Sequence, residues 1–279
     1  DRIESRGLGD VYKRQADPLV CVSLEGTTVK EMLDEAARAG IAGADLIEVR
    51  FDRLYLSKPQ PTVTENEEGE VTKTMPPASE WPVRDFSDIN IEESITALKE
   101  GIALPVIFAA RPVREGGHFS GDEAQRINAL EAGIASGATW VDLEVSIEDS
   151  TRTKLMKAAK ASSCKVVASI HDTDSTPSAE DIQGLIKDNA DKGDLIKFCG
   201  TVNDHQDALQ IIEATHAMST EKIDFAAMAL GNGGDWARLH APVLNQTMVY
   251  ATMRNEFRLS DKGLVNVRDL KEAWNLLEY

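Results

Sequence analysis

The stretch GDLIKFCGT, residues 193–201, contains an apolar run of the kind that forms a buried strand, interrupted by one lysine, Lys197. Lysine is almost never fully buried unless it is paired. Three explanations are therefore open: Lys197 ends an edge strand with its charge in solvent, it pairs with a carboxylate, or it is a reactive amine. Burial disfavours the ammonium form, and a neutral amine can attack a ketone to form a Schiff base.

Similar apolar runs recur along the chain and alternate with segments of helical periodicity, which is typical of repeated βα units. The runs that predict strands are residues 19–24, 45–50, 105–110, 140–144, 165–170, 194–198, 223–228 and 247–251. The helical patterns lie near residues 27–40, 91–101, 121–136, 150–162, 178–191, 204–217, 235–241 and 267–277. This order predicts an α/β protein of the (β/α)8 TIM-barrel class. An open Rossmann sheet would more often show a glycine-rich fingerprint after its first strand, and none follows here.

The length of 279 residues fits one barrel, which needs roughly 250 residues. We expect one barrel domain over residues 16–279, because residues 1–15 show no apolar periodicity and resemble a non-native leader. Residues 57–90 are an insertion rich in Pro, Glu and Thr, within which residues 62–73 (TVTENEEGEVTK) alternate like a small hairpin. The insertion follows a strand, so it is either part of a lid over the active-site face or a solvated acidic excursion.

The composition excludes several classes of partner. A net charge of −17 argues against nucleic acid or an anionic membrane, since both attract clustered Lys and Arg. No apolar run approaches the roughly 18 residues that span a membrane. The three cysteines are widely spaced, and we interpret them as reduced thiols of a cytoplasmic protein. No HxxxH or HxH spacing occurs, so no metal site is predicted.

Charged residues follow the predicted strands, where a barrel places its active site. The second strand ends in Glu48, Arg50 and Asp52, whose period-two spacing puts the three side chains on one side. His171 follows the fifth strand, and the unperturbed pKa of histidine suits proton transfer near neutrality. Each alone has an ordinary alternative, an ion pair for Glu48 with Arg50 and a hydrogen bond to a loop for His171.

Two glycine-containing loops carry further charged groups. Arg111 and Glu115 belong to RPVREGG, residues 111–117, where the glycines would let the backbone approach a ligand. Arg238 ends the turn GNGGDWAR, residues 231–238, and is able to clamp a carboxylate bidentately. Taken alone, Arg238 is more readily explained as a surface cation.

Together these residues resemble the type I 3-dehydroquinate dehydratase family. The shared motifs are EVRFD (48–52), RPVREGGHFSGDEAQR (111–126), SIH (169–171) with TPS (176–178), and IK (196–197). The resemblance runs from about residue 19 to the C-terminus and covers seven of the eight predicted strand ends in order. The spacing of residues 111–126 is most similar to plant-type enzymes, in which this domain is fused to shikimate dehydrogenase.

The resemblance implies an enzyme of the shikimate pathway, free of metal and cofactor, that dehydrates 3-dehydroquinate to 3-dehydroshikimate. Lys197 would form the Schiff base, and His171, oriented by Glu115, would transfer protons. In the substrate pocket, Glu48 and Arg50 would hold hydroxyl groups and Arg238 the carboxylate. The implied substrate-binding residues are Ser23, Glu48, Arg50, Arg111, Arg238 and Ser260. The implied partner is the small-molecule substrate, while a homodimer and a fused shikimate dehydrogenase domain remain open.

The chain departs from the family in its last quarter. Where the family carries a Ser-Ala-Pro-Gly-Gln lid, this chain has Ser260, Asp261, Lys262, Gly263 and Leu264. Leu264 cannot make the hydrogen bonds of the lid glutamine, so a polar contact is lost or is supplied by another residue such as Lys262.

Two alternative functions stay open at this point. One is a dehydratase-like domain kept for binding or regulation, and the other is a Schiff-base aldolase on the same barrel. A domain freed from catalysis has no reason to keep both His171 and Lys197, and an aldolase does not predict the Glu48, Arg50 and Asp52 set. The sequence therefore favours the dehydratase.

Overall fold

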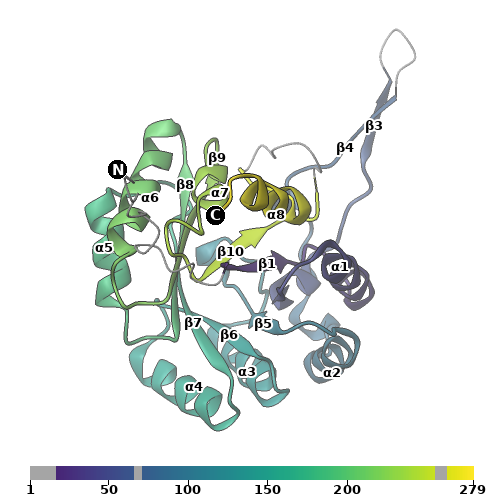
Figure 1. The fold of residues 1–279 in the computed structure, drawn as a ribbon. Coiled ribbons are helices and arrows are strands. Elements are labelled where there is room, and N and C mark those ends of the chain that lie inside the picture. Colours follow the sequence, from purple (N-terminus) through teal and green to yellow (C-terminus); the bar gives the residue numbers. More distant parts are fainter. Residues whose placement is uncertain (1–16, 66–70, 255–262) are drawn as a thin grey trace, which may run out of the picture.

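The computed structural model describes residues 17–65, 71–254 and 263–279, and its main feature is a nearly closed barrel of eight parallel strands with helices between them (Figure 1). The barrel strands are β1 (Leu19–Ser23), β2 (Leu46–Arg50), β5 (Val106–Ala109), β6 (Trp140–Glu144), β7 (Lys165–His171), β8 (Leu195–Val202), β9 (Phe225–Gly231) and β10 (Met248–Ala251). Their order around the sheet is β10-β1-β2-β5-β6-β7-β8-β9. The predicted TIM barrel and all eight predicted strands are confirmed. The predicted leader, residues 1–15, lies outside the described residues.

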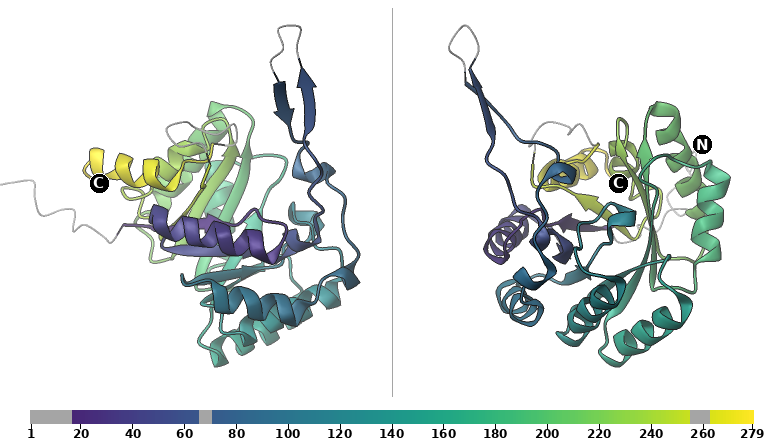
Figure 2. Two further views of the ribbon diagram at one scale, coloured as in Figure 1. Left: turned by 90° about the vertical axis from the view of Figure 1, so that its right-hand side faces the viewer. Right: turned by 180° about the vertical axis from the view of Figure 1, so that it is seen from behind.

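Helices follow each barrel strand and surround the sheet (Figure 2). They are α1 (Val29–Ala42), α2 (Ile91–Gly101), α3 (Glu123–Ala135), α4 (Asp149–Ala161), α5 (Ala179–Asp188), α6 (His205–Met218), α7 (Asp235–Leu239) and α8 (Val267–Leu276). Short polar side chains begin many of them; Asp122, for example, caps α3 in a capping box with Gln125. No helix in the described ranges is long and apolar enough to cross a bilayer.

The barrel closes between β9 and β10, the two ends of the sheet order, through a side chain as well as the backbone. Thr247 donates its backbone N–H to the carbonyl oxygen of Phe225 at 2.9 Å. One step further along, the Gln246 side chain accepts from the N–H of Ala227 at 2.9 Å and donates to the carbonyl oxygen of Ala237. Gln246 thus takes the place of a neighbouring strand where the backbone ladder is incomplete.

The insertion after β2 carries a two-stranded antiparallel hairpin, which confirms the hairpin expected there. Strands β3 (Thr62–Glu65) and β4 (Val71–Thr74) pair from Thr62 with Thr74 to Glu65 with Val71. Figures 1 and 2 show this hairpin projecting away from the barrel. The residues that connect the two strands lie outside the described residues.

Candidate active site

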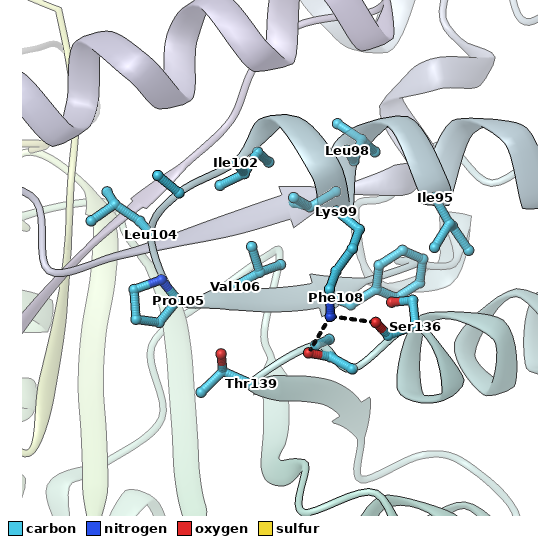
Figure 3. A pocket seen from close by; sticks show the side chains of 14 residues that line it. Ile95, Leu98, Lys99, Ile102, Leu104, Pro105, Val106, Phe108, Ser136 and Thr139 are labelled. Carbon is cyan, nitrogen blue, oxygen red and sulfur yellow. Dashed lines mark hydrogen bonds between the residues drawn. The ribbon is translucent and has the colours of Figure 1, made fainter.

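Two cavities in the described structure differ in chemistry. One, of about 320 Å³, lies between α2 and α3 and is lined mainly by apolar side chains (Figure 3). Its one charged lining residue, Lys99, donates to the carbonyl oxygens of Ser136 and Gly137. The other, of about 410 Å³, is lined by residues at the C-terminal ends of the barrel strands and contains both Lys197 and His171. The second cavity is therefore the candidate active site.

The side chains inside the barrel change from apolar to polar along the strands. The apolar part is formed by Cys21, Leu46, Ile107, Trp140, Val167, Leu195, Ala226 and Met248; Met228 and Tyr250 belong to the same cluster but also line the cavity. Because side chains alternate along a strand, the residue two positions further on also points inward. Lys197 follows Leu195 in this way, and Asp142 follows Trp140. Both are buried, and both face the cavity end of the barrel interior.

Lys197 is the central residue of this polar part. Lys197 is 5% exposed, and β8 lies between β7 and β9, so the explanation as the solvated end of an edge strand is wrong. The Nζ atom lies 3.1 Å from Oε1 of Glu48, 3.5 Å from Oδ2 of Asp142 and 4.1 Å from the ring centroid of Tyr250. The expected pairing with a carboxylate is confirmed, and the reactive amine stays a prediction.

The two carboxylates beside Lys197 are held ionised. Burial raises the pKa of Glu48, but the cations around it, Lys197 and then Arg111, outweigh burial and lower that pKa below its ordinary value. Burial also raises the pKa of Asp142, and the same cations lower it by more than burial raises it. Hydroxyl donors also stabilise the ionised carboxylates, since Ser23 donates to Glu48 at 2.5 Å and Ser169 donates to Asp142.

Arg111 connects the carboxylates with the histidine. Its Nη2 atom lies 2.7 Å from Oδ2 of Asp142 and 3.8 Å from Oε1 of Glu48. Its Nη1 atom lies 2.6 Å from Nδ1 and 2.5 Å from Nε2 of His171. One N–H cannot serve both ring nitrogens, and the nitrogen with the free lone pair is its acceptor.

His171 is poised as a neutral base. Its Nδ1 atom lies 3.1 Å from Oε2 of Glu115, and Ser146 donates to the other oxygen of Glu115. A hydrogen on Nδ1 that faces Glu115 leaves the lone pair on Nε2. Burial, followed by the positive charges of Arg111 and Lys197, holds the pKa of His171 well below its ordinary value. Burial raises the pKa of Glu115.

Of the three charged residues expected on one side of the second strand, Glu48 and Arg50 line the cavity, whereas Asp52 lies beyond the end of the strand. β2 ends at Arg50, and Asp52 lies in the 3₁₀ helix η1 (Phe51–Tyr55), so the period-two spacing no longer applies to it. Arg50 instead pairs with Asp52 through two hydrogen bonds of 2.8 Å. Asp52 also accepts the backbone N–H groups of Arg111 and His118. Arg50 still lines the cavity, as Glu48 and Ser23 do.

Arg238 lines the cavity but differs from the free carboxylate clamp expected from the sequence. It is 1% exposed, its Nε donates to the carbonyl oxygen of Tyr250 at 2.8 Å, and its Nη1 donates to those of Ala229 at 2.8 Å and Gly263 at 3.2 Å. The guanidinium group therefore joins β9, β10 and the segment before α8. Only Nη2 has no protein partner within the described ranges, which leaves a single nitrogen for a ligand.

Several residues at the site were not singled out from the sequence. Asp142 lies inside the predicted strand WVDLE rather than after it, and the same alternation that placed Lys197 inside the barrel could have placed Asp142 there. Glu144, two positions later, accepts from Arg126, and burial raises the pKa of Glu144 to about 7. Tyr250 gave no polar signal, because its contact with Lys197 is made by the ring face.

The altered lid is only partly visible. Ser260, Asp261 and Lys262 lie outside the described residues, and Leu264 lines the cavity.

Within the described ranges, no group of three or more His, Cys, Asp or Glu side chains is arranged to hold a metal ion.

Known proteins resemble this chain in both sequence and fold. A family model described as type I 3-dehydroquinase matches residues 20–279. The chain is 26% identical over 270 residues to the chloroplastic bifunctional 3-dehydroquinate dehydratase/shikimate dehydrogenase of Arabidopsis thaliana. The aligned region covers 96% of this chain but only 38% of the Arabidopsis protein. It is 25% identical over 272 residues to the 3-dehydroquinate dehydratase of Methanosarcina acetivorans, covering 96% of this chain and 97% of that one.

Two solved structures share the barrel. The type I 3-dehydroquinate dehydratase of Clostridium difficile, with covalently modified comenic acid, has a TM-score of 0.76 at 22% identity and covers 95% of this chain and 94% of that chain. The 3-dehydroquinate dehydratase of Geobacillus kaustophilus has a TM-score of 0.75 at 21% identity, covering 94% of this chain and 92% of that chain. Identities this low show the common fold.

Proposed function

The chain belongs to the type I 3-dehydroquinase family, and we propose that it dehydrates 3-dehydroquinate to 3-dehydroshikimate, as a hydro-lyase, through a Schiff base on Lys197. The observation that carries this proposal is the surrounding of the Lys197 nitrogen: a buried amine between Glu48 and Asp142, in one cavity with a neutral histidine. An amine and a proton-transfer group at one site are what this chemistry needs.

The first step joins the Lys197 nitrogen to the C3 carbon of the ketone. The Lys197 ammonium group, which pairs with Glu48 and Asp142, gives up two of its three protons in this step. His171 passes these protons to the carbonyl oxygen, which leaves as water. The nitrogen keeps one hydrogen and becomes a positively charged iminium group, which draws electrons from the neighbouring C2–H bond. The ionised carboxylates of Glu48 and Asp142, whose oxygens lie 3.1 and 3.5 Å from the Lys197 nitrogen, stabilise this charge.

The second step removes water from the ring. His171 takes the C2 proton, which leaves a neutral enamine, and returns that proton to the C1 hydroxyl group. The hydroxyl departs as water while the enamine electron pair restores the iminium. One water then hydrolyses the iminium, so the whole cycle releases a single water. The positive charge of Arg111 beside His171 weakens it as a base and strengthens it as an acid.

The remaining site residues hold the reactive groups and the substrate. Glu115 orients His171 through the 3.1 Å contact with Nδ1. Ser23 fixes Glu48, and Arg50 lies at the cavity wall, where it contacts substrate hydroxyls. Arg238 contributes one nitrogen to the substrate carboxylate, and Ser260 stays a predicted binding residue.

Turnover tests the function directly. Purified protein is mixed with 3-dehydroquinate, and the ultraviolet absorbance of the conjugated enone product is followed. We expect the absorbance to rise with wild-type protein and not with Lys197→Ala. An unchanged rate in Lys197→Ala would refute the Schiff base. Absence of turnover in the wild type would refute the dehydratase and favour the binding or regulatory domain.

Finer aspects stay proposals. We propose a single barrel domain over residues 16–279, supported by the match over residues 20–279, and retain residues 1–15 as a predicted leader. A cytoplasmic location, a homodimer and a fused shikimate dehydrogenase domain also stay predictions; the Arabidopsis relative is such a bifunctional protein by name.

A further inference from the structure

The insertion after β2 has two parts with different surroundings. The hairpin of β3 and β4 is solvent-exposed, and its apolar residues Val63 and Val71 are 58% and 57% exposed. The loop that follows returns to the barrel, where Pro77, Ala78 and Ser79 line the active-site cavity. The hairpin therefore projects into solvent, whereas the loop after it, although Pro77 and Ser79 are also exposed, forms part of the cavity wall.

Main-chain contacts anchor this wall where the insertion leaves and re-enters the barrel. Ser57 donates its N–H to the carbonyl oxygen of Pro82 at 2.8 Å, and Arg84 donates its N–H to that of Tyr55 at 2.7 Å. Between them Leu56 and Val83 form an antiparallel bridge. The Arg84 side chain adds a hydrogen bond of 3.1 Å to the carbonyl oxygen of Leu54, beside the end of β2.

The loop itself is stiff. Pro76 and Pro77 have fixed φ angles, which lowers the entropy lost on ordering. The indole N–H of Trp81 donates to the carbonyl oxygen of Pro76 at 2.9 Å and closes the loop around the 3₁₀ helix η2 (Ala78–Glu80). A polar group on such a loop is preorganised for a ligand.

Ser79 supplies that polar group. Ser79 is exposed at the cavity, its hydroxyl makes no hydrogen bond to the described part of the chain, and a hydroxyl can both donate to and accept from a ligand. Leu264 lines the same cavity, and its side chain is apolar. The cavity therefore has a polar residue from the insertion in addition to the apolar residue of the altered lid.

We propose that the loop 76–81 is a specificity wall of the active site, in which the Ser79 hydroxyl hydrogen-bonds to a polar group of the bound substrate. The inference rests on the proposed function for the identity of that substrate, a polyhydroxylated ring carboxylate. Ser79 contributes binding and takes no part in bond breaking, so its contact is the same in the substrate complex and in the transition state.

Two variants test the wall. Ser79→Ala should raise KM for 3-dehydroquinate about 2- to 10-fold, with kcat within about twofold, because one neutral hydrogen bond is lost equally from both states. Replacing Pro77, Ala78 and Ser79 together by glycine should raise KM further, since stiffness is lost as well. The matched control shortens the hairpin, with two glycines replacing residues 63–73, and should leave KM unchanged.

The outcomes separate this inference from the proposed function. If Ser79→Ala and the triple-glycine variant both keep the wild-type KM, the proposed role of the loop 76–81 in substrate binding is overturned. If the wild type gives no turnover, the proposed function fails and 3-dehydroquinate binding is measured by calorimetry instead. Weaker binding to Ser79→Ala than to the wild type then supports the wall, whereas equal binding, or no binding to the wild type, overturns it.

Discussion

The barrel interior has two halves that differ in chemistry. The lower half is the apolar part described above, and the upper half is the polar part at the cavity end, around Lys197. On four strands an apolar residue of the lower half is followed two positions later by a polar residue of the upper half: Leu46 by Glu48, Trp140 by Asp142, Val167 by Ser169 and Leu195 by Lys197. The strand geometry is the same in both halves. The difference therefore reflects what each half is for.

The lower half stabilises the fold by apolar burial, whereas the upper half cannot be explained in that way. Buried ion pairs often contribute less to stability than apolar side chains of similar volume. Lys197, Glu48, Asp142 and Arg111 are nevertheless buried together at the cavity end of the barrel. The upper half costs stability and supplies chemistry, which predicts that substitutions in the two halves have separable effects.

After the loss of turnover expected for Lys197→Ala, the largest effect is expected at His171, in the upper half. His171→Ala should lower kcat about 100- to 10,000-fold, because the group that moves the C2 proton is lost, while the melting temperature changes little. Enone absorbance measures the rate. The exposed His216 on α6 is the matched control, and His216→Ala should keep the wild-type rate. A rate within tenfold of wild type would remove His171 from the role of acid and base.

The opposite result is expected at Leu195, two positions before Lys197 on the same strand. Leu195→Ala opens a cavity in the lower half and should lower the free energy of unfolding by about 2 to 5 kcal/mol. Its kcat should stay within about threefold of wild type at a temperature where the variant is folded. Urea denaturation and the turnover assay give the two numbers. A large loss of turnover without a loss of stability would contradict the division into halves.

A smaller effect is expected at Asp142. Asp142→Asn removes a charge beside both Lys197 and Arg111 and should lower kcat about 10- to 100-fold, as for a hydrogen bond to a charged group. Ser169→Ala is the control, because it removes one donor to Asp142 and keeps the charge, so its effect should be below tenfold. Equal rates for Asp142→Asn and the wild type would show that the carboxylate is structural.

The smallest effect is a shift of pH dependence at Arg111. His171 must be neutral to take the C2 proton, so wild-type kcat should hold at pH 6.5 and fall only at lower pH, since the pKa of His171 is well below 6.5. Arg111→Met removes the neighbouring positive charge, raises that pKa and should move the acid limb upward by about one pH unit. Arg111→Lys keeps the charge and should stay near the wild-type profile. If the acid limb of Arg111→Met does not move, the charge of Arg111 does not lower the pKa of His171.

How much of the fold could be predicted from the sequence depends on whether a feature arises from a local run of residues or from pairing between distant segments. All eight barrel strands were predictable because each is an apolar run, yet β8 extends to Val202, beyond the predicted end at residue 198. Gly200 is not a typical strand residue, and β8 continues through it because Gly200 and Thr201 pair with Ala229 and Leu230 of β9. The pairing between distant segments outweighs local preference and is not visible in one segment.

The site shows the same limit. Lys197 and His171 stood out as polar residues within or after apolar runs, and both line the cavity. The fixed guanidinium of Arg238 could not be foreseen, because its acceptors are backbone carbonyl oxygens, and every residue has one. Asp142 was not predicted as a site residue because it lies in the middle of a strand, whereas the predicted site residues lie mainly at strand ends.

The account depends most directly on whether the buried amine of Lys197 becomes covalently attached to the substrate. The measurement is to add 3-dehydroquinate with sodium borohydride to the wild-type protein, digest it and locate the adduct by mass spectrometry. The account predicts a reduced adduct on the peptide that contains Lys197, absent from Lys197→Ala. Full turnover with no trapped adduct, or an adduct on another lysine, would contradict it.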